Sequence, residues 1–246
     1  VDVEKDSWCI DTVEIEKVLT ACKKAHITGV DANKAADDGV KLIDHLPIEN
    51  EELIFFTIRA LYESRRFDEA LSLAEQLSTS TNYVMQAEGF HFMALSLSPQ
   101  QADTRTTHLR NALSIGKSNN DQLLISTISN SLAEQLSYGS DKDKQEAHDL
   151  FIKSLDIKEN QDIKDLAGMA RTHGGLGRLA YFSSPRDTEA AKNHFQEDLA
   201  ISHEINDQRG MSQMNSFLSQ LDLQEGNNNK AIKRSMTILN IANNPF

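Results

Sequence analysis

The chain has 246 residues, of which 37 are acidic and 25 basic, giving a formal net charge of −12 at pH 7. Such an acidic chain repels phosphate backbones, which argues against nucleic acid as a direct partner. No apolar run reaches the roughly 18 residues that a membrane-spanning helix needs, and alternating strand patterns are almost absent. The composition therefore favours an all-α protein without a membrane span in this part of the sequence.

The chain begins at Val1 and not at a methionine, so we expect it to be an excised part or a processed product of a longer protein. The compartment, cytoplasmic or periplasmic, therefore stays open. On one continuous helix Cys9 and Cys22 would lie about 20 Å apart, whereas a disulfide needs Cα atoms within about 7 Å. We expect both to be small packing residues, unless Cys9 folds back along the helix.

The first two predicted helices are the least regular. Apolar residues within 10–25 recur at helical spacing and predict the first helix. The chain then turns at Thr28-Gly29, where Asp31 is placed to cap the next helix. A second apolar face covers residues 35–46, and Pro47 ends it.

The later helices alternate with short polar turns. Their predicted ranges are 53–62, 67–77, 83–97, 102–115, 123–136, 144–157, 164–182, 188–205, 211–224 and 229–242. Turns this short make neighbouring helices antiparallel. The chain is thus expected to form one domain, 1–246, of about six helical hairpins, with approximate ranges 8–47, 51–79, 82–117, 121–158, 164–205 and 210–243.

Two residue types recur at a nearly constant spacing. The leucines at 113, 155, 199 and 239 are separated by 42, 44 and 40 residues. The aspartates at 121, 165 and 207 mark the beginnings of the last three hairpins, with steps of 44 and 42. Recurrence of this kind is typical of a helical solenoid, in which each hairpin leaves an apolar face that only the next hairpin can cover.

Gly174, Gly175 and Gly177 lie together within the predicted helix 164–182. A phosphate-binding glycine loop would need a strand before it, and none is predicted there. Glycine costs a helix about 1 kcal/mol relative to alanine, so a cluster of glycines indicates that another helix approaches closely. A large side chain at such a contact would overpack it, at a cost of about 1–3 kcal/mol.

Residues 67–70 read Phe-Asp-Glu-Ala at the start of the second helix of a hairpin, with Ala70 at the packing position. This pattern resembles the tetratricopeptide repeat, in which a small residue on the first helix packs against an alanine early on the second. Further matches are Ala147 with Phe151, Ala191 with Phe195, Leu176-Gly177, Gly226 before Ala231, and Pro47 near a helix end.

The resemblance covers about residues 8–244 and is strongest after residue 51. It departs from the family at Arg105, where the alanine is expected, and at 183–188, which looks like an insertion. The spacing exceeds the family's usual repeat of about 34 residues and is similar to the long-helix variant of kinesin light chains and bacterial regulator sensor arms. The resemblance implies an all-α fold: a right-handed superhelix of about six hairpins.

In tetratricopeptide arrays the first helix of each hairpin lines the concave surface. Carried onto this chain, the groove-facing positions are Arg59, Tyr62, Asn130, Glu134, Arg171, Arg178, Gln213 and Gln220. Such a polar face suits a protein or peptide segment, and the alternative is that these side chains are simply solvated.

We expect the surface over residues 165–224 to be the main recognition site. Arg171 and Arg178 lie two helical turns apart and therefore share one face. Both are cations in an acidic chain, and guanidinium groups bind carboxylates well. The rival interpretation is that both arginines pair with neighbouring acidic side chains, where such pairs contribute about 0–1 kcal/mol.

No pattern marks a catalytic nucleophile with its base. His194 and Glu197 share a helix face, but no second ligand cluster repeats their spacing, so we predict an ordinary helix surface without metal. His173, beside the glycine cluster, is interpreted as packed or solvated, with a role in the groove as the alternative. We therefore predict no metal, no cofactor and no catalytic residues in this chain.

Three functions remain in competition. The first is a protein- or peptide-binding arm of a larger signalling or regulatory protein, and the second is a free-standing assembly scaffold. The third is an enzyme with an active site in the superhelix, for which a buried acid with a shifted pKa beside the groove would be the indicator. The expected partner is a protein or peptide segment, and a homodimer remains open.

Overall fold

The computed structural model describes residues 12–46, 50–160 and 165–243, and every regular element in that part of the chain is a helix. The α-helices are α1 (Thr12–Thr28), α2 (Ala32–His45), α3 (Glu51–Glu63), α4 (Phe67–Leu77), α5 (Tyr83–Ser96), α6 (Ala102–Ser118), α7 (Gln122–Leu136), α8 (Asp141–Glu159), α9 (Leu166–Tyr181), α10 (Thr188–Glu204), α11 (Gln208–Gln224) and α12 (Asn228–Asn243). A short 3-10 turn, Pro99–Gln101, precedes α6. The all-α prediction is confirmed.

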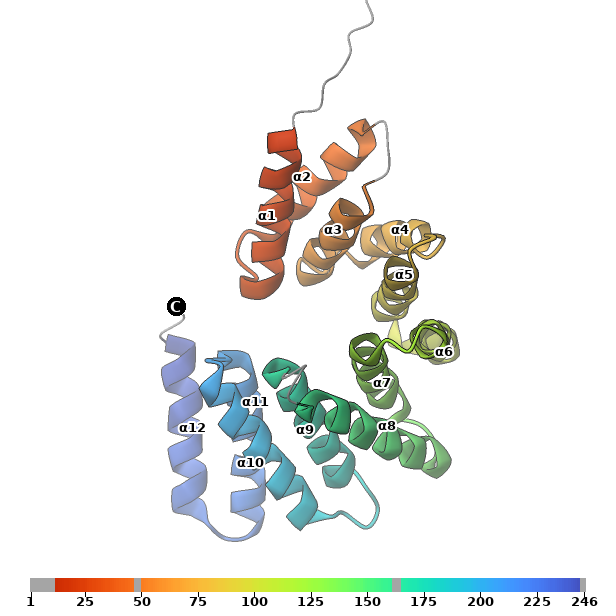
Figure 1. Cartoon of the computed structure of the whole chain (residues 1–246). Helices are drawn as coiled ribbons and strands as arrows, with labels where there is room; N and C mark the ends of the chain where they lie inside the picture. Colours follow the sequence, from red (N-terminus) through yellow and green to blue (C-terminus); the bar gives the residue numbers. More distant parts are fainter. Residues whose placement is uncertain (1–11, 47–49, 161–164, 244–246) are drawn as a thin grey trace, which may run out of the picture. The chain divides into compact units, whose positions relative to one another are not determined.

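The chain divides into two compact units, Val1–Asn119 and Asn120–Phe246. The described helices of the first unit are α1 to α6, and those of the second are α7 to α12. In the second unit each helix packs against the next along the chain, and α9 also contacts both α7 and α11 (Figure 1). The first helices of successive hairpins are therefore neighbours, as the repeat pattern predicts.

The recurring aspartates begin the first helix of each hairpin in the second unit. Asp121, Asp165 and Asp207 are the N-cap residues of α7, α9 and α11. Each accepts a hydrogen bond of 2.9 or 3.0 Å from the backbone N–H three residues further on. Such a cap stabilises a helix by about 1 kcal/mol, because it satisfies an N–H that has no partner within the helix.

The prediction that Asp31 caps the second helix is wrong. Asp31 precedes α2 with a left-handed φ of 57° and makes no side-chain capping bond. A side-chain cap normally requires extended backbone at this residue. The turn instead uses Gly29, at φ 67°, whose N–H donates to the carbonyl of Ala25 at 2.7 Å.

Two other predicted features fall at or near residues that are not described. Cys9 and Pro47 lie outside the described residues. Cys22 is buried as a free thiol, and its Sγ donates to the carbonyl oxygen of Ala35 at 3.3 Å. Its packing role is therefore the one expected for a small apolar residue.

The packing positions behave as the sequence predicts. The second-helix alanines Ala70, Ala147, Ala191 and Ala231 are all buried. A Cβ atom added to Gly175 would lie 2.5 Å from the ring of Phe151 on α8. One added to Gly177 would lie 2.5 Å from the ring of Phe195 on α10. Helix α9 thus receives an aromatic ring from each neighbouring second helix, which explains the glycines at positions 175 and 177.

Arg105, the exception to this pattern, has a different role at the start of α6. Its Nε donates to the carbonyl oxygen of Ala94 at 3.0 Å. Ala94 lies in the last turn of α5, whose final carbonyl groups have no partner within the helix. Arg105 therefore ties the two helices of this hairpin through a hydrogen bond.

Candidate binding surface

The candidate surface lies in the second unit, on the neighbouring helices α7, α9 and α11. Six of the predicted residues lie there, two on each helix: Asn130 and Glu134, Arg171 and Arg178, Gln213 and Gln220. Because the three helices occupy the same position in successive hairpins, residues about one repeat apart face each other across helix boundaries.

Arg178 is the most connected of these side chains. Its Nη2 donates to Oε1 of Glu134 at 3.1 Å, and both side chains are partly exposed. The guanidinium also lies near the carboxylate of Asp198 on α10. A Cβ atom added to Gly174 would lie 2.5 Å from Oδ2 of Asp198 and 3.4 Å from Nη1 of Arg178. Arg178 is therefore paired with the partly exposed carboxylate of Glu134 on α7 and lies near the buried carboxylate of Asp198 on α10.

Asp198 is unusual because its side chain is buried, with 5% of the residue exposed. Burial raises its pKa to about 6, although a hydrogen bond from Ser202 and the charge of Arg178 both act to lower it. The Oγ of Ser202 donates to Oδ1 of Asp198 at 2.9 Å. This buried acid was not singled out from the sequence, because hydrophobic periodicity does not mark a polar residue on a buried face.

Next to Arg178, at the C-terminal end of α9, the surface is aromatic. Tyr181 donates its hydroxyl to Oε1 of Gln220 on α11 at 3.0 Å. The guanidinium carbon of Arg186 lies 4.2 Å from the centre of the Tyr181 ring. Phe217 meets the same ring edge-on at 5.5 Å between centroids. Gln220 is thereby held at the junction of α9 and α11.

The other three predicted residues of this unit differ in accessibility. Arg171 and Gln213 are exposed, and neither has a hydrogen bond or ion pair within the described part of the chain. Asn130 is only 7% exposed, and its Oδ1 accepts a hydrogen bond from Thr172 Oγ1 at 2.9 Å. Asn130 therefore joins α7 to α9, while Arg171 and Gln213 are exposed to solvent.

The remaining two predicted residues, Arg59 and Tyr62, lie on α3 of the first unit. Arg59 donates to Nε2 of His26 on α1, and its guanidinium lies 5.1 Å from the centre of the Phe55 ring. Tyr62 packs edge-on against the rings of Phe67 and Phe92, at 5.5 and 6.0 Å between centroids. Both side chains are engaged in joining helices of their own unit.

The structure also brings together His173 on α9 and His194 on α10. Their Nδ1 atoms are 3.1 Å apart, so one imidazole donates and the other accepts. Burial lowers the pKa of both, and Glu197 opposes this shift. Within residues 12–46, 50–160 and 165–243, no group of three or more His, Cys, Asp or Glu side chains could hold a metal ion.

Lys158, at the end of α8, is a second buried titratable group that the sequence did not reveal. Its Nζ donates to Ser154 Oγ at 2.7 Å, and that hydroxyl donates to the carbonyl of Ser126 at 2.8 Å. Burial lowers the pKa of the lysine to about 8.

None of the described helices is both long enough and apolar enough to cross a membrane.

No family model matches the chain, and no curated protein matches its sequence. Several solved structures share its fold, among them the following two. The crystal structure of BtubC (BKLC) from P. vanneervenii has a TM-score of 0.65 and 19% identity, covering 94% of this chain and 93% of that chain. The crystal structure of a Rap protein complexed with Competence and Sporulation Factor has a TM-score of 0.65 and 14% identity, covering 94% of this chain and 77% of that chain. At these identities the likeness establishes the fold alone, an all-α helical repeat.

Proposed function

We propose that the second unit binds a protein or extended peptide segment on the face formed by α7, α9 and α11. The observation that carries this proposal is the position of Arg178. Its guanidinium is held by the partly exposed carboxylate of Glu134 from the neighbouring hairpin. Surface ion pairs contribute only about 0–1 kcal/mol. A ligand carboxylate can therefore replace Glu134 at little cost and bind a guanidinium that is already positioned.

The neighbouring side chains suit an extended chain. An extended peptide has backbone N–H and C=O groups that need partners, and the amides of Gln213 and Gln220 can both donate and accept. Arg171 lies two turns from Arg178 on α9 and is exposed. The face thus offers two cations and two amides on adjacent helices, which is the chemistry that acidic peptide segments require.

We further propose that the hairpins are tetratricopeptide-like repeats and that the chain is the interaction arm of a larger signalling or regulatory protein. The complex of the Rap protein supports a binding role for this type of fold. The alternative of a free-standing scaffold predicts several partners on different faces, whereas an interaction arm predicts one ligand on the surface described above. Asp198 is a buried acid with a raised pKa near Arg178, which is the indicator given above for an enzyme, so an active site in this unit is the third candidate function.

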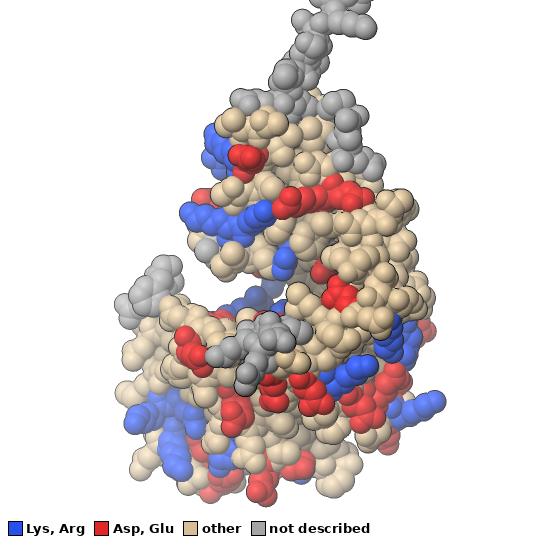
Figure 2. Space-filling model, viewed as in Figure 1, with Lys and Arg blue, Asp and Glu red and all other residues tan. Residues whose placement is uncertain are grey.

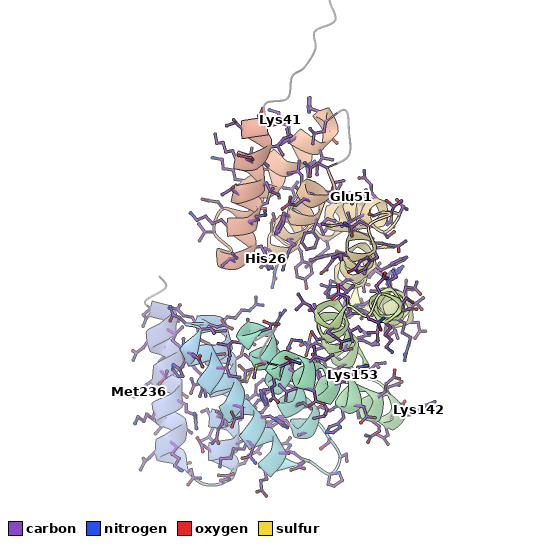
Figure 3. The ribbon with its side chains drawn as sticks, viewed as in Figure 1. His26, Lys41, Glu51, Lys142, Lys153 and Met236 are labelled. Carbon is purple, nitrogen blue, oxygen red and sulfur yellow. The ribbon has the colours of Figure 1, made fainter. Side chains whose placement is uncertain are left out.

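Selection from a displayed library of random linear peptides tests the proposal. The affinity of the selected peptides is then measured by fluorescence anisotropy, for the wild-type chain and for the Arg171→Ala/Arg178→Ala variant. The matched control is Lys142→Ala/Lys153→Ala, which removes two exposed cations from α8 in the same unit (Figure 3). We expect the arginine variant to lose about thirtyfold in affinity, equivalent to about 2 kcal/mol. Unchanged affinity in a folded arginine variant would show that this face is not the site.

A further inference from the structure

The guanidinium of Arg178 faces two carboxylates that differ in their exposure to solvent. Its Nη2 donates to Oε1 of Glu134 at 3.1 Å, and 44% of the Glu134 side chain is exposed. Asp198 is only 5% exposed. Its Oδ2 and Nη1 of Arg178 lie 2.5 and 3.4 Å from one point, the position of a Cβ atom added to Gly174. One cation therefore joins a carboxylate at the surface to a carboxylate in the interior.

The charges that act on Asp198 come from the two helices packed against α10, which are α9 and α11. From α9, the charge of Arg178 favours the ionised carboxylate. From the start of α11, the N-cap residue Asp207 opposes it. On α10 itself, Ser202 donates to Oδ1 of Asp198 at 2.9 Å. The ionised form of Asp198 therefore depends on Arg178 and Ser202.

The charge of this cluster changes in mildly acidic solution. Burial raises the pKa of Asp198 to about 6, so its carboxyl is ionised at neutral pH and becomes protonated below that value. Near neutral pH, the two carboxylates of Glu134 and Asp198 outnumber the one guanidinium of Arg178, and the cluster is negative. Once Asp198 is protonated, Glu134 and Arg178 balance each other.

An acidic ligand therefore meets two different states of the same site. When Asp198 is ionised, a ligand carboxylate at Arg178 competes with Glu134 and is also repelled by Asp198. When Asp198 is protonated, that repulsion is absent. The guanidinium has five N–H donors, so Glu134 and a ligand carboxylate can then share it. Charges in a partly buried site are screened less than charges at the surface, so the two states differ in ligand affinity.

More distant charges of the unit have less influence on such a ligand. Figure 2 shows acidic side chains spread among the basic ones on the visible face of the second unit. Exposed charges that are separated by more than about 8–10 Å are largely screened at ordinary ionic strength. The affinity for an acidic segment therefore depends mainly on the groups close to Arg178.

We propose that Asp198 regulates the face of α7, α9 and α11: its protonation strengthens, and its ionisation weakens, the binding of an acidic peptide segment at Arg178. This inference rests on the proposed function, because it requires the ligand to bind at Arg178. Coupling between two sites is reciprocal, so the bound segment makes Asp198 hold its proton more tightly. The segment is bound in mildly acidic solution and released as the pH rises.

The pH dependence of peptide affinity tests this inference. An acidic peptide without histidine is selected on the wild-type chain, and its affinity is measured by fluorescence anisotropy at about pH 7.5 and about pH 5.5, where ordinary carboxylates stay ionised. We expect the wild-type chain to bind about fivefold or more tightly at the lower pH. Asp198→Asn should bind at both pH values as tightly as the wild-type chain does at the lower one, because the amide carries no charge.

Two control variants change other titratable groups of the same helices. Glu204→Gln removes an exposed carboxylate from α10 and should keep the pH response of the wild-type chain. His173→Gln/His194→Gln removes two imidazoles that titrate in the same range, on which Glu197 acts. This variant should also keep the response. Thermal melting verifies that each variant is folded.

Equal wild-type affinity at the two pH values, or tighter binding at the higher pH, would overturn the inference. So would an unchanged pH response in Asp198→Asn. These results differ from a failure of the proposed function, in which Arg171→Ala/Arg178→Ala binds the peptide like wild type at both pH values, a result that would overturn both proposals.

A measurement without ligand tests the coupling by itself. NMR of the carboxyl carbon of Asp198 gives its titration midpoint in the wild-type chain and in Arg178→Ala. The midpoint should lie at a higher pH in the variant, because the guanidinium favours the ionised carboxylate. Equal midpoints would show that Arg178 and Asp198 are not coupled, and the inference would be wrong.

Discussion

Glu134 on α7 and Arg178 on α9 form an ion pair at 3.1 Å although they are 44 residues apart. That separation is one repeat of the chain, the same step that separates Asp121 from Asp165. The repeat therefore places equivalent positions of successive first helices side by side. A ligand that lies across these helices meets residues from several hairpins at once, which a single helix could not offer.

Gly175→Ala should destabilise the chain despite the higher helix propensity of alanine. The added methyl group would lie 2.5 Å from the Phe151 ring, and overpacking of this kind costs about 1–3 kcal/mol. Urea denaturation of the variant measures the loss. Phe151→Leu in the same chain should recover part of it, giving a coupling energy in a double-mutant cycle. Additive effects would contradict the contact.

Ala191→Trp and Ala200→Trp should differ strongly, although both change alanine on α10. Ala191 is buried against the neighbouring helices and Ala200 is exposed. We expect Ala191→Trp to lower the free energy of unfolding by about 1–3 kcal/mol through overpacking. Ala200→Trp should change it by no more than about 0.5 kcal/mol. Thermal melting compares them, and similar shifts would refute the register assigned to α10.

The His173–His194 contact should make the fold sensitive to mild acid. Burial lowers the pKa of both imidazoles below the ordinary value of 6.5, so the unfolded chain takes up protons first as pH falls. The contribution of the two neutral imidazoles to the free energy of unfolding is therefore fully present above pH 6.5 and is lost as the pH falls below it. Between about pH 7.5 and about pH 5, the urea midpoint of His173→Gln/His194→Gln should therefore fall less than that of the wild-type chain.

The exposed His203, also on α10, provides the control for that measurement. His203→Gln removes one imidazole from the same helix without touching the contact between α9 and α10. Its pH profile should match that of the wild-type chain. An unaltered profile in the double variant would mean that the histidine pair does not contribute to the pH dependence.

Asp198→Asn should act in the opposite sense. Burial raises the pKa of this carboxyl from 3.8 to about 6, so the folded state holds its proton more tightly than the unfolded state. Stability is therefore lost as pH rises through this range, and the cost of the buried charge is fully present above about pH 6. The amide removes that cost and can still accept from Ser202. Urea denaturation should show stabilisation near neutral pH that shrinks on acidification, and destabilisation at every pH would contradict this account.

Much of the architecture could be predicted because it depends on local patterns. Apolar periodicity and small residues gave the helices to within a few residues. The largest discrepancies have local causes. Helix α8 begins at Asp141 and not at 144, because Ser140 and Asp143 form a capping box that the apolar pattern does not reveal. Asp31 resembled a cap by residue type, but its backbone conformation prevents it.

The candidate surface was harder to predict, for a physical reason. The pattern marks which residues share a helix face, but not which of them a neighbouring helix covers. Asn130 and Gln213 were therefore treated alike, although one is buried against Thr172 and the other is exposed. The pairing of Glu134 with Arg178 could have been inferred from the repeat step of 44 residues. The burial of Asp198 and Lys158 had no such signal.

Photo-crosslinking tests the proposed binding face most directly. A benzophenone amino acid replaces Gln213, which is exposed on α11, or Lys153, which is exposed on α8. Each chain is irradiated with a peptide selected on the wild-type protein, and the crosslinked products are identified by mass spectrometry. The proposal predicts that the peptide crosslinks at position 213 and that Arg171→Ala/Arg178→Ala abolishes this product. Crosslinking at position 153 with none at position 213 would contradict a ligand site on α7, α9 and α11.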